Sequence, residues 1–236
     1  MKYLEFIYWE FRYRLLFLLW NIAGKLSQLD GIVLMYHHVT NDDVNTNDSC
    51  ICSIEQFEST LVKYKMGNRK FVSVDQMLNI LANEEKVPFA VVTFDDVPYD
   101  FYINAYPLLK KMHIPFVLFI TIDFLDKPGF LNKVQLKELD LDPLCTIGAH
   151  TVSHPMLRNS PNSVAELVDS KRLLEEFLGH KIEYMAYPYG RQSSVSRKII
   201  GQAKKAGYKC AFGTIQAPIS RMSSKNIFYL PRVVEN

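Results

Sequence analysis

The chain has 236 residues, of which 48% are hydrophobic and 22% are charged, with 27 basic against 25 acidic side chains. This composition is that of a globular protein and excludes a disordered, collagen-like or disulfide-dense scaffold. The near balance of charge argues against a general nucleic-acid-binding protein, which usually carries a basic face. Aromatic residues make up 13% of the chain, a high value compatible with a thick core, a sugar-binding groove or membrane contact.

The first thirty residues hold much of the aromatic excess. Two glutamates and two arginines interrupt their apolar run, and no small-residue cleavage site follows, so the segment does not fit a secretory signal peptide. The longest apolar stretch, residues 15–20, is far shorter than the ~20 residues that a membrane-spanning helix needs. We expect residues 1–29 to form an amphipathic helix that either contacts a membrane through residues 1–26 or packs on the following domain. We therefore expect a cytoplasmic protein or one bound to the cytoplasmic face of the membrane.

Short apolar strands and amphipathic helices alternate from residue 31 onward. The predicted strands cover residues 32–36, 71–74, 89–94, 116–121, 146–149, 182–187 and 208–212, with 230–234 as a further short candidate. The predicted helices include residues 54–64, 74–81, 105–112, 164–178 and 195–206. This alternation predicts a parallel α/β sheet, open or closed into a barrel, in one domain over residues 30–236. In either arrangement, chemistry is expected at the C-terminal ends of the strands.

Four of the predicted strands end in residues that are polar or that form a rigid turn. The residues at these four ends are His37-His38, Asp95-Asp96, His150 with His154 four positions later, and Pro188-Tyr189-Gly190. Each has a structural explanation on its own, because an aspartate often caps a helix and a lone histidine is usually structural. Their arrival at one edge of the sheet favours a functional site. One aspartate and two histidines leave a zinc-like ion with an open position, as in catalytic sites, and the same set accepts Co or Ni.

Three segments then carry a family resemblance over roughly residues 30–236. They resemble, in order and spacing, the first three motifs of the polysaccharide deacetylase family (NodB homology, carbohydrate esterase family 4): Thr93-Phe94-Asp95-Asp96, His150-Thr151-Val152-Ser153-His154 and Tyr187-Pro188-Tyr189-Gly190. The resemblance implies a distorted (β/α)7 barrel and the metal-dependent removal of an N-acetyl group from an amino sugar. The product would be acetate and a free amine.

The resemblance also implies a role for each motif residue. Asp95 would be the general base, and Asp96, His150 and His154 would hold the metal ion. The backbone N–H of Tyr189, in the turn formed with Pro188 and Tyr187, would stabilise the oxyanion together with the ion.

The sequence departs from the family pattern at two positions. Val97 stands where a glycine normally follows the Asp pair, and a side chain there could narrow the pocket or reshape the loop over the metal. Ala186 stands where many members carry the arginine that holds the base carboxylate. We therefore expect another arginine beside Asp95, first Arg232 in the last short strand and second Arg191.

The usual C-terminal Leu-x-His motif is also missing, since no histidine follows His180. The segment Leu34-Met35-Tyr36-His37-His38 instead resembles the N-terminal segment of the poly-N-acetylglucosamine deacetylase branch, in which an early strand supplies the general acid. The resemblance thus implies that His37 is the general acid. His38 would support the site without contacting the metal or the substrate itself.

Two classes of function remain open from the sequence. The first is an N-deacetylase acting on an N-acetylated glycan or on its lipid- or nucleotide-linked precursor. The second is a catalytically impaired homologue that binds a glycan or a partner protein at a membrane surface. Within the enzymes, another metal-dependent hydrolase on the same fold, such as an amide or peptidoglycan deacetylase, is a third possibility. Val97 and Ala186 favour the second class, whereas the retained aspartates and histidines favour the first.

Overall fold

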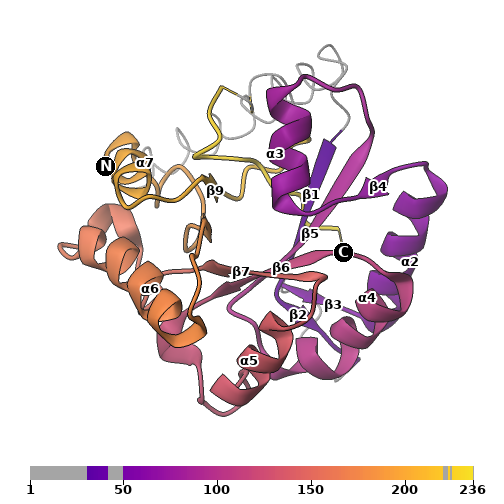
Figure 1. Cartoon of the computed structure of the whole chain (residues 1–236), viewed down its shortest axis with the longest axis horizontal. Coiled ribbons are helices and arrows are strands. Elements are labelled where there is room, and N and C mark those ends of the chain that lie inside the picture. Colours follow the sequence, from indigo (N-terminus) through magenta and orange to yellow (C-terminus); the bar gives the residue numbers. More distant parts are fainter. Residues whose placement is uncertain (1–30, 42–49, 220–222, 224, 236) are drawn as a thin grey trace, which may run out of the picture.

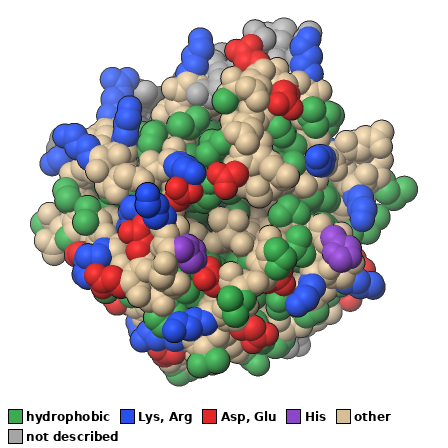
Figure 2. Space-filling view, viewed as in Figure 1, with side chains coloured by type: hydrophobic (Ala, Val, Ile, Leu, Met, Phe, Trp, Pro, Cys, Tyr) green, Lys and Arg blue, Asp and Glu red, His purple; other side chains and the backbone are tan. Residues whose placement is uncertain are grey.

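The structure is a computed structural model that describes residues 31–41, 50–219, 223 and 225–235. The amphipathic helix expected over residues 1–29 lies outside this range, so its membrane contact stays a prediction. Among the described residues, no helix has both the length and the apolar character needed to cross a bilayer. Figure 2 shows basic and acidic side chains intermixed over the face in view, in keeping with the small net charge of +2.

One parallel sheet forms the centre of the molecule. Its strands follow the order β1-β5-β6-β7-β8-β9, and β4 pairs with the beginning of β5 beside them. The strands are β1 (Gly31–Tyr36), β4 (Lys70–Phe71), β5 (Phe89–Asp95), β6 (Phe116–Ile120), β7 (Cys145–Ala149), β8 (Tyr184–Ala186) and β9 (Cys210–Phe212). A small second sheet pairs β2 (His38–Val39) with β3 (Ile51–Cys52). Every residue of β5 is buried, as expected for a strand covered on both faces.

Residues 230–233 close the seam between the two edge strands of the central sheet. Leu230 forms a parallel bridge with Phe212 of β9, and Val233 forms one with Leu34 of β1. On the β1 side, the N–H of Val233 donates to the carbonyl of Val33 at 2.7 Å, and its own carbonyl accepts from Met35. The short strand expected near residue 230 is therefore present as two bridges. With this closure, the sheet has the distorted (β/α) barrel form that the sequence predicts.

The helices surround the strands, as Figure 1 shows. They are α2 (Ile54–Met66), α3 (Val74–Ala82), α4 (Tyr106–Met112), α5 (Lys133–Asp140), α6 (Ser163–Leu178) and α7 (Arg197–Lys205), with single turns η1 (Phe101–Ala105), η2 (Ile122–Phe124) and η3 (Leu157–Asn159). Sequence signals explain where several of them start. Capping boxes, in which an N-cap side chain and a glutamine three residues later bond each other's backbone N–H, begin α2, α3 and α5.

Some boundaries differ from the sequence prediction for local reasons. The strand expected over 71–74 ends at Phe71, because Ser73 takes the N-cap position of α3. The helix expected from residue 195 begins at Arg197, because Ser196 caps it. Helix α5 has no counterpart in the predicted elements: it has eight residues and buries only Leu136 and Leu139, too few to establish a helical period.

Candidate active site

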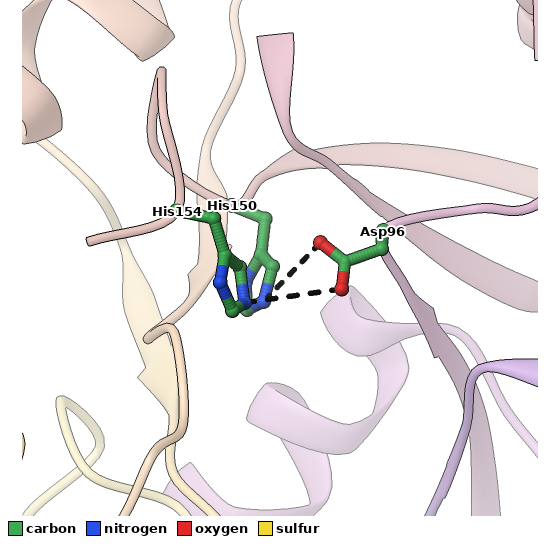
Figure 3. Close-up of side chains that lie close together, drawn as sticks. All are labelled: Asp96, His150 and His154. Atoms are coloured by element: carbon green, nitrogen blue, oxygen red, sulfur yellow. Dashed lines mark ion pairs between the residues drawn. The ribbon is translucent and has the colours of Figure 1, made fainter. Parts of the chain in front are cut away.

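Three predicted metal ligands come together at the C-terminal ends of the barrel strands. Asp96 follows β5 and His150 follows β7, while His154 lies in the loop after His150. One ligand atom from each residue lies within 4.8 Å of the others. The two imidazoles lie side by side and face the Asp96 carboxylate, with Nε2 of His150 4.0 Å from Oδ1 and Nε2 of His154 3.8 Å from Oδ2 (Figure 3). Two nitrogens and one carboxylate are a donor set that suits zinc and similar divalent ions.

His150 is oriented as a metal ligand needs to be. Its ring is 1% exposed, and Nδ1 lies 2.8 Å from the carbonyl oxygen of Ala186. A carbonyl oxygen only accepts hydrogen bonds, so Nδ1 carries the proton and the lone pair of the neutral ring stays on Nε2. Burial lowers the pKa of His150 and so favours this neutral form, although Asp95 and Asp96 act in the opposite direction.

Asp96 is held by a residue that the sequence analysis did not identify. The hydroxyl of Thr121 donates to Oδ1 of Asp96 at 2.7 Å and is also 3.3 Å from the His150 carbonyl. Thr121 is fully buried and directly follows β6, at the same edge of the sheet as the metal ligands. The signal was therefore present in the sequence as a polar residue after a buried apolar strand.

The expected base, Asp95, is paired with Arg232. The two terminal nitrogens of Arg232 each donate to one Asp95 oxygen at 2.6 Å, and both side chains are buried. Burial alone would raise the pKa of Asp95, but the Arg232 guanidinium outweighs it and, with help from His150, holds that pKa well below its usual range. Arg191, the second candidate, lines the cavity and makes no ion pair with Asp95. The structure thus places Arg232 where the departure at Ala186 requires a cation.

His37 and His38 line the same cavity as the three predicted metal ligands. This cavity has a volume of about 820 Å³ and is also lined by Asp95, Asp96 and Tyr189. Burial lowers the pKa of His37, while the nearby carboxylates of Asp95 and Asp96 oppose that shift. His38 has a different environment, because its Nδ1 lies 2.6 Å from a carboxylate oxygen of Asp100.

The Pro188-Tyr189-Gly190 turn contains a backbone donor, unpaired within the described part of the chain, in a residue that lines the cavity. Tyr189 has a φ of +61°, and its N–H donates to no group among the described residues. The turn is fixed on its carbonyl side, where the Thr214 hydroxyl donates to Tyr189 and the Tyr229 hydroxyl donates to Gly190. The Tyr189 ring is 53% exposed beside the cavity, whereas Tyr187 is fully buried and donates to the Phe228 carbonyl. Tyr187 therefore supports the turn from the core and does not line the cavity.

Val97 does not narrow the cavity. Its side chain is 1% exposed and belongs to the hydrophobic core, while the cavity wall nearby is formed by Pro98 and Phe130. Its backbone has a φ of +53°, directly after Asp96 at +59°. A β-branched residue in this left-handed region is strained, so the family glycine is replaced here at a conformational cost.

Comparisons with known proteins agree with this geometry. A family model described as polysaccharide deacetylase matches residues 82–211. The chain is 30% identical over 240 residues to a poly-β-1,6-N-acetyl-D-glucosamine N-deacetylase of Staphylococcus aureus strain MRSA252, covering 89% of this chain and 80% of that protein. Among solved structures, it resembles IcaB from Ammonifex degensii, with a TM-score of 0.76, 25% identity, and coverage of 88% of this chain and 92% of that one. It also resembles the deacetylase PplD of Streptococcus pyogenes in complex with acetate, with a TM-score of 0.75, 26% identity, and coverage of 87% and 91%.

Proposed function

Because the chain belongs to the polysaccharide deacetylase family, we propose that it is a metal-dependent N-deacetylase that hydrolyses the acetamide of an N-acetylated amino sugar in a polysaccharide or its precursor. The observation that carries the proposal is the joint placement of two kinds of group in one cavity. An ionised, buried Asp95 lies beside the Asp96, His150 and His154 cluster, with Nε2 of His150 3.9 Å from an Asp95 oxygen. A protein that only bound glycan would have no use for a charged base beside an open metal site.

The donor set fits a divalent ion held by Asp96, His150 and His154, with zinc as the first choice and Co or Ni as alternatives. When bound there, such an ion polarises the acetamide carbonyl and lowers the pKa of a water molecule. Three ligands from the protein leave room for both water and substrate, which is the arrangement of a catalytic site.

The chain's own residues would carry the protons. Asp95 stays ionised at neutral pH, so one of its carboxylate oxygens takes the proton from the attacking water. The free N–H of Tyr189 donates to the carbonyl oxygen as negative charge develops on it. His37, in the protonated form that the Asp95 and Asp96 carboxylates favour against the effect of burial, then gives a proton to the nitrogen of the leaving amine. The C–N bond breaks, and acetate and a free amino sugar remain.

We further propose a β-1,6-linked poly-N-acetylglucosamine as the first substrate to test. Support comes from the relatives of that name and from the wall of the cavity. Pro98, Phe130 and the exposed ring of Tyr189 line that wall and offer apolar surface to the faces of a sugar ring.

The test is acetate release from three substrates: β-1,6-linked N-acetylglucosamine oligomers, chitooligosaccharides and peptidoglycan. We expect release from at least one of them, strongest with the β-1,6 oligomer. We also expect loss with a chelator and restoration by added metal. The Asp96→Asn variant should lose both metal binding and release. Zero release from every substrate with metal fully bound would favour the alternative of a glycan-binding homologue.

A further inference from the structure

The two histidines of the metal cluster are held in different ways. His150 is fixed by its own hydrogen bond to the Ala186 carbonyl and by nearly complete burial. In the described part of the chain, the His154 ring makes no hydrogen bond. Apart from the 3.8 Å contact between its Nε2 and Asp96, it packs against neighbouring rings, with centroids 5.9 Å from Phe124 and 4.8 Å from Tyr189. The position of the His154 Nε2 therefore depends on the backbone of the loop 151–154.

That loop has an unfavourable backbone conformation at both ends. Thr151 has a φ of +70° and His154 a φ of +57°, and neither is a glycine. A residue other than glycine is strained in this left-handed region, so surrounding contacts must hold it there. One such contact is local, since the N–H of His154 donates to the Thr151 hydroxyl at 3.1 Å. Two others come from η2, whose Ile122 and Asp123 donate their N–H groups to the carbonyls of Thr151 and Val152.

The middle of the loop is held by a single carboxylate. Oε2 of Glu166 accepts the N–H of Val152 at 2.9 Å and the N–H of Ser153 at 3.0 Å. Oε1 of Glu166 accepts the Ser153 hydroxyl at 2.6 Å. Glu166 lies in the first turn of α6, so a helix on the outside of the barrel fixes the segment between the two histidines. Three hydrogen bonds to an ionised acceptor are stronger than the same bonds to a neutral one.

We propose that Glu166 is a positioning residue for the metal site: its carboxylate holds the loop 151–154 so that His154 reaches the same point as Asp96 and His150. The inference rests on the metal dependence proposed above, and Glu166 itself touches neither metal nor substrate. Residues that orient metal ligands from behind typically change metal affinity by about 10- to 100-fold when they are removed. A purely structural alternative exists, because an acidic residue in the first turn also stabilises a helix through its dipole.

The experiment measures the affinity of the full chain for Co²⁺ by competition with a chelator, with the visible absorption of bound Co²⁺ as a second signal. We expect Glu166→Ala to weaken Co²⁺ binding by about 10- to 100-fold and to alter the absorption spectrum. Ser153→Ala removes one of the three hydrogen bonds and should weaken binding by a smaller factor. Glu166→Gln keeps an acceptor oxygen for the two N–H groups and loses the charge, so its affinity should lie between those of Glu166→Ala and the wild type.

The control is Glu176→Ala on the same helix. Glu176 is an exposed carboxylate that pairs with Arg172 at 2.9 Å, far along the helix from the loop, so Co²⁺ affinity should not change. Thermal unfolding in the presence of a chelator shows whether each variant is folded without metal as the wild type is. If Glu166→Ala does not fold, Ser153→Ala and Glu166→Gln decide the question.

Three outcomes would overturn the inference. The first is wild-type Co²⁺ affinity in Glu166→Ala, which would leave the carboxylate a structural role only. The second is a Glu166→Gln variant that binds as weakly as Glu166→Ala, since charge and not loop geometry would then dominate. The third is a wild-type chain that binds no Co²⁺, and this result alone would also remove the metal dependence proposed above.

Discussion

Arg232 and Asp95 form a bidentate ion pair in the interior of the barrel, where residues 230–233 close the sheet. Both nitrogen–oxygen distances are 2.6 Å, and the guanidinium has no exposed surface. Two further donor groups of Arg232 are used, since Nε donates to the Gly213 carbonyl at 2.9 Å and one terminal nitrogen also donates to Thr93. The pair keeps Asp95 ionised in a place where burial alone would favour the protonated acid.

Replacing Arg232 should therefore damage both catalysis and stability. Arg232→Gln leaves a buried carboxylate without a cation, which costs about 3–5 kcal/mol in the free energy of unfolding. Arg232→Lys keeps the positive charge, but its single terminal nitrogen cannot bond both Asp95 oxygens as arginine does. We expect the Asp95 carboxylate to shift as a result and kcat to fall by up to about 100-fold. Acetate release and urea unfolding measure the two effects. Arg172→Lys, an exposed exchange on α6, is the control, and unchanged kcat in Arg232→Lys would contradict the role.

His37→Ala should abolish turnover while metal binding persists. His37 is assigned the proton transfer to the leaving amine, and it is not one of the three clustered ligands. The measurement pairs acetate release with Co²⁺ affinity on the same preparation. His38→Ala is the comparison: because His38 is held by Asp100, we expect it to lower activity by a smaller factor. Near-normal activity in His37→Ala would rule out the assignment.

Val97 allows the strain of its backbone to be separated from the burial of its side chain. Val97→Ala removes buried methyl groups and keeps the left-handed backbone, so it should lower the free energy of unfolding by about 2 kcal/mol. Val97→Gly removes one more carbon atom, but glycine has no strain in the left-handed region, so about 1 kcal/mol of the free energy of unfolding is recovered. We thus expect Val97→Gly to be the more stable of the two variants in urea unfolding. The reverse order would show that the φ of +53° carries no strain.

The stability that Glu235 contributes should depend on pH. Glu235 accepts a hydrogen bond from the Tyr64 hydroxyl and pairs with Lys63 at 2.7 Å, which ties the segment after Arg232 to α2. Burial would raise the pKa of Glu235, but these two partners lower it below the usual 4.5. Because the folded-state pKa is the lower one, the contribution is fully present above the unfolded-state pKa and is lost as pH falls through the folded-state pKa.

We therefore expect Glu235→Gln to lower the free energy of unfolding at pH 7 by about 0.5 kcal/mol, since the pair is partly solvated. The difference from the wild type should shrink as the pH falls below about 4. Urea unfolding at a series of pH values measures it. Glu58→Gln, an exposed change on α2, should give no such pH-dependent difference. If the difference in free energy of unfolding between wild type and Glu235→Gln stays constant from pH 7 to pH 3, the lowered pKa of Glu235 in the folded protein is contradicted.

Residue patterns in the sequence predicted the parts of the site that lie at strand ends. Parallel strands present their C-terminal ends at one edge of the sheet, so the sequence alone placed Asp96 and His150 near each other. Arg232 was an inference of a different kind: the departure at Ala186 required a cation, but its place depended on a contact between residues 137 positions apart.

Other features of the site left a weak pattern in the sequence or none. Glu166 lies in the first turn of an amphipathic helix, where an acidic residue is already common, so nothing marks it as the holder of a distant loop. Thr121 could have been found as the polar residue that follows a buried strand. The strained backbone at Val97 was visible only as a departure from glycine, and the direction of its side chain needed the packed core.

The closing segment at residues 230–233 also has a consequence for the order of events during synthesis. The ribosome synthesises the proposed base, the three proposed metal ligands and the Tyr189 turn before it synthesises Arg232. Until that segment inserts between β9 and β1, the seam stays open and the Asp95 carboxylate lacks its guanidinium. Closure of the barrel and formation of the Asp95–Arg232 ion pair therefore occur in the same step of folding. A nascent chain can therefore hold all three of the motifs that this protein shares with its family while Asp95 still lacks its cation.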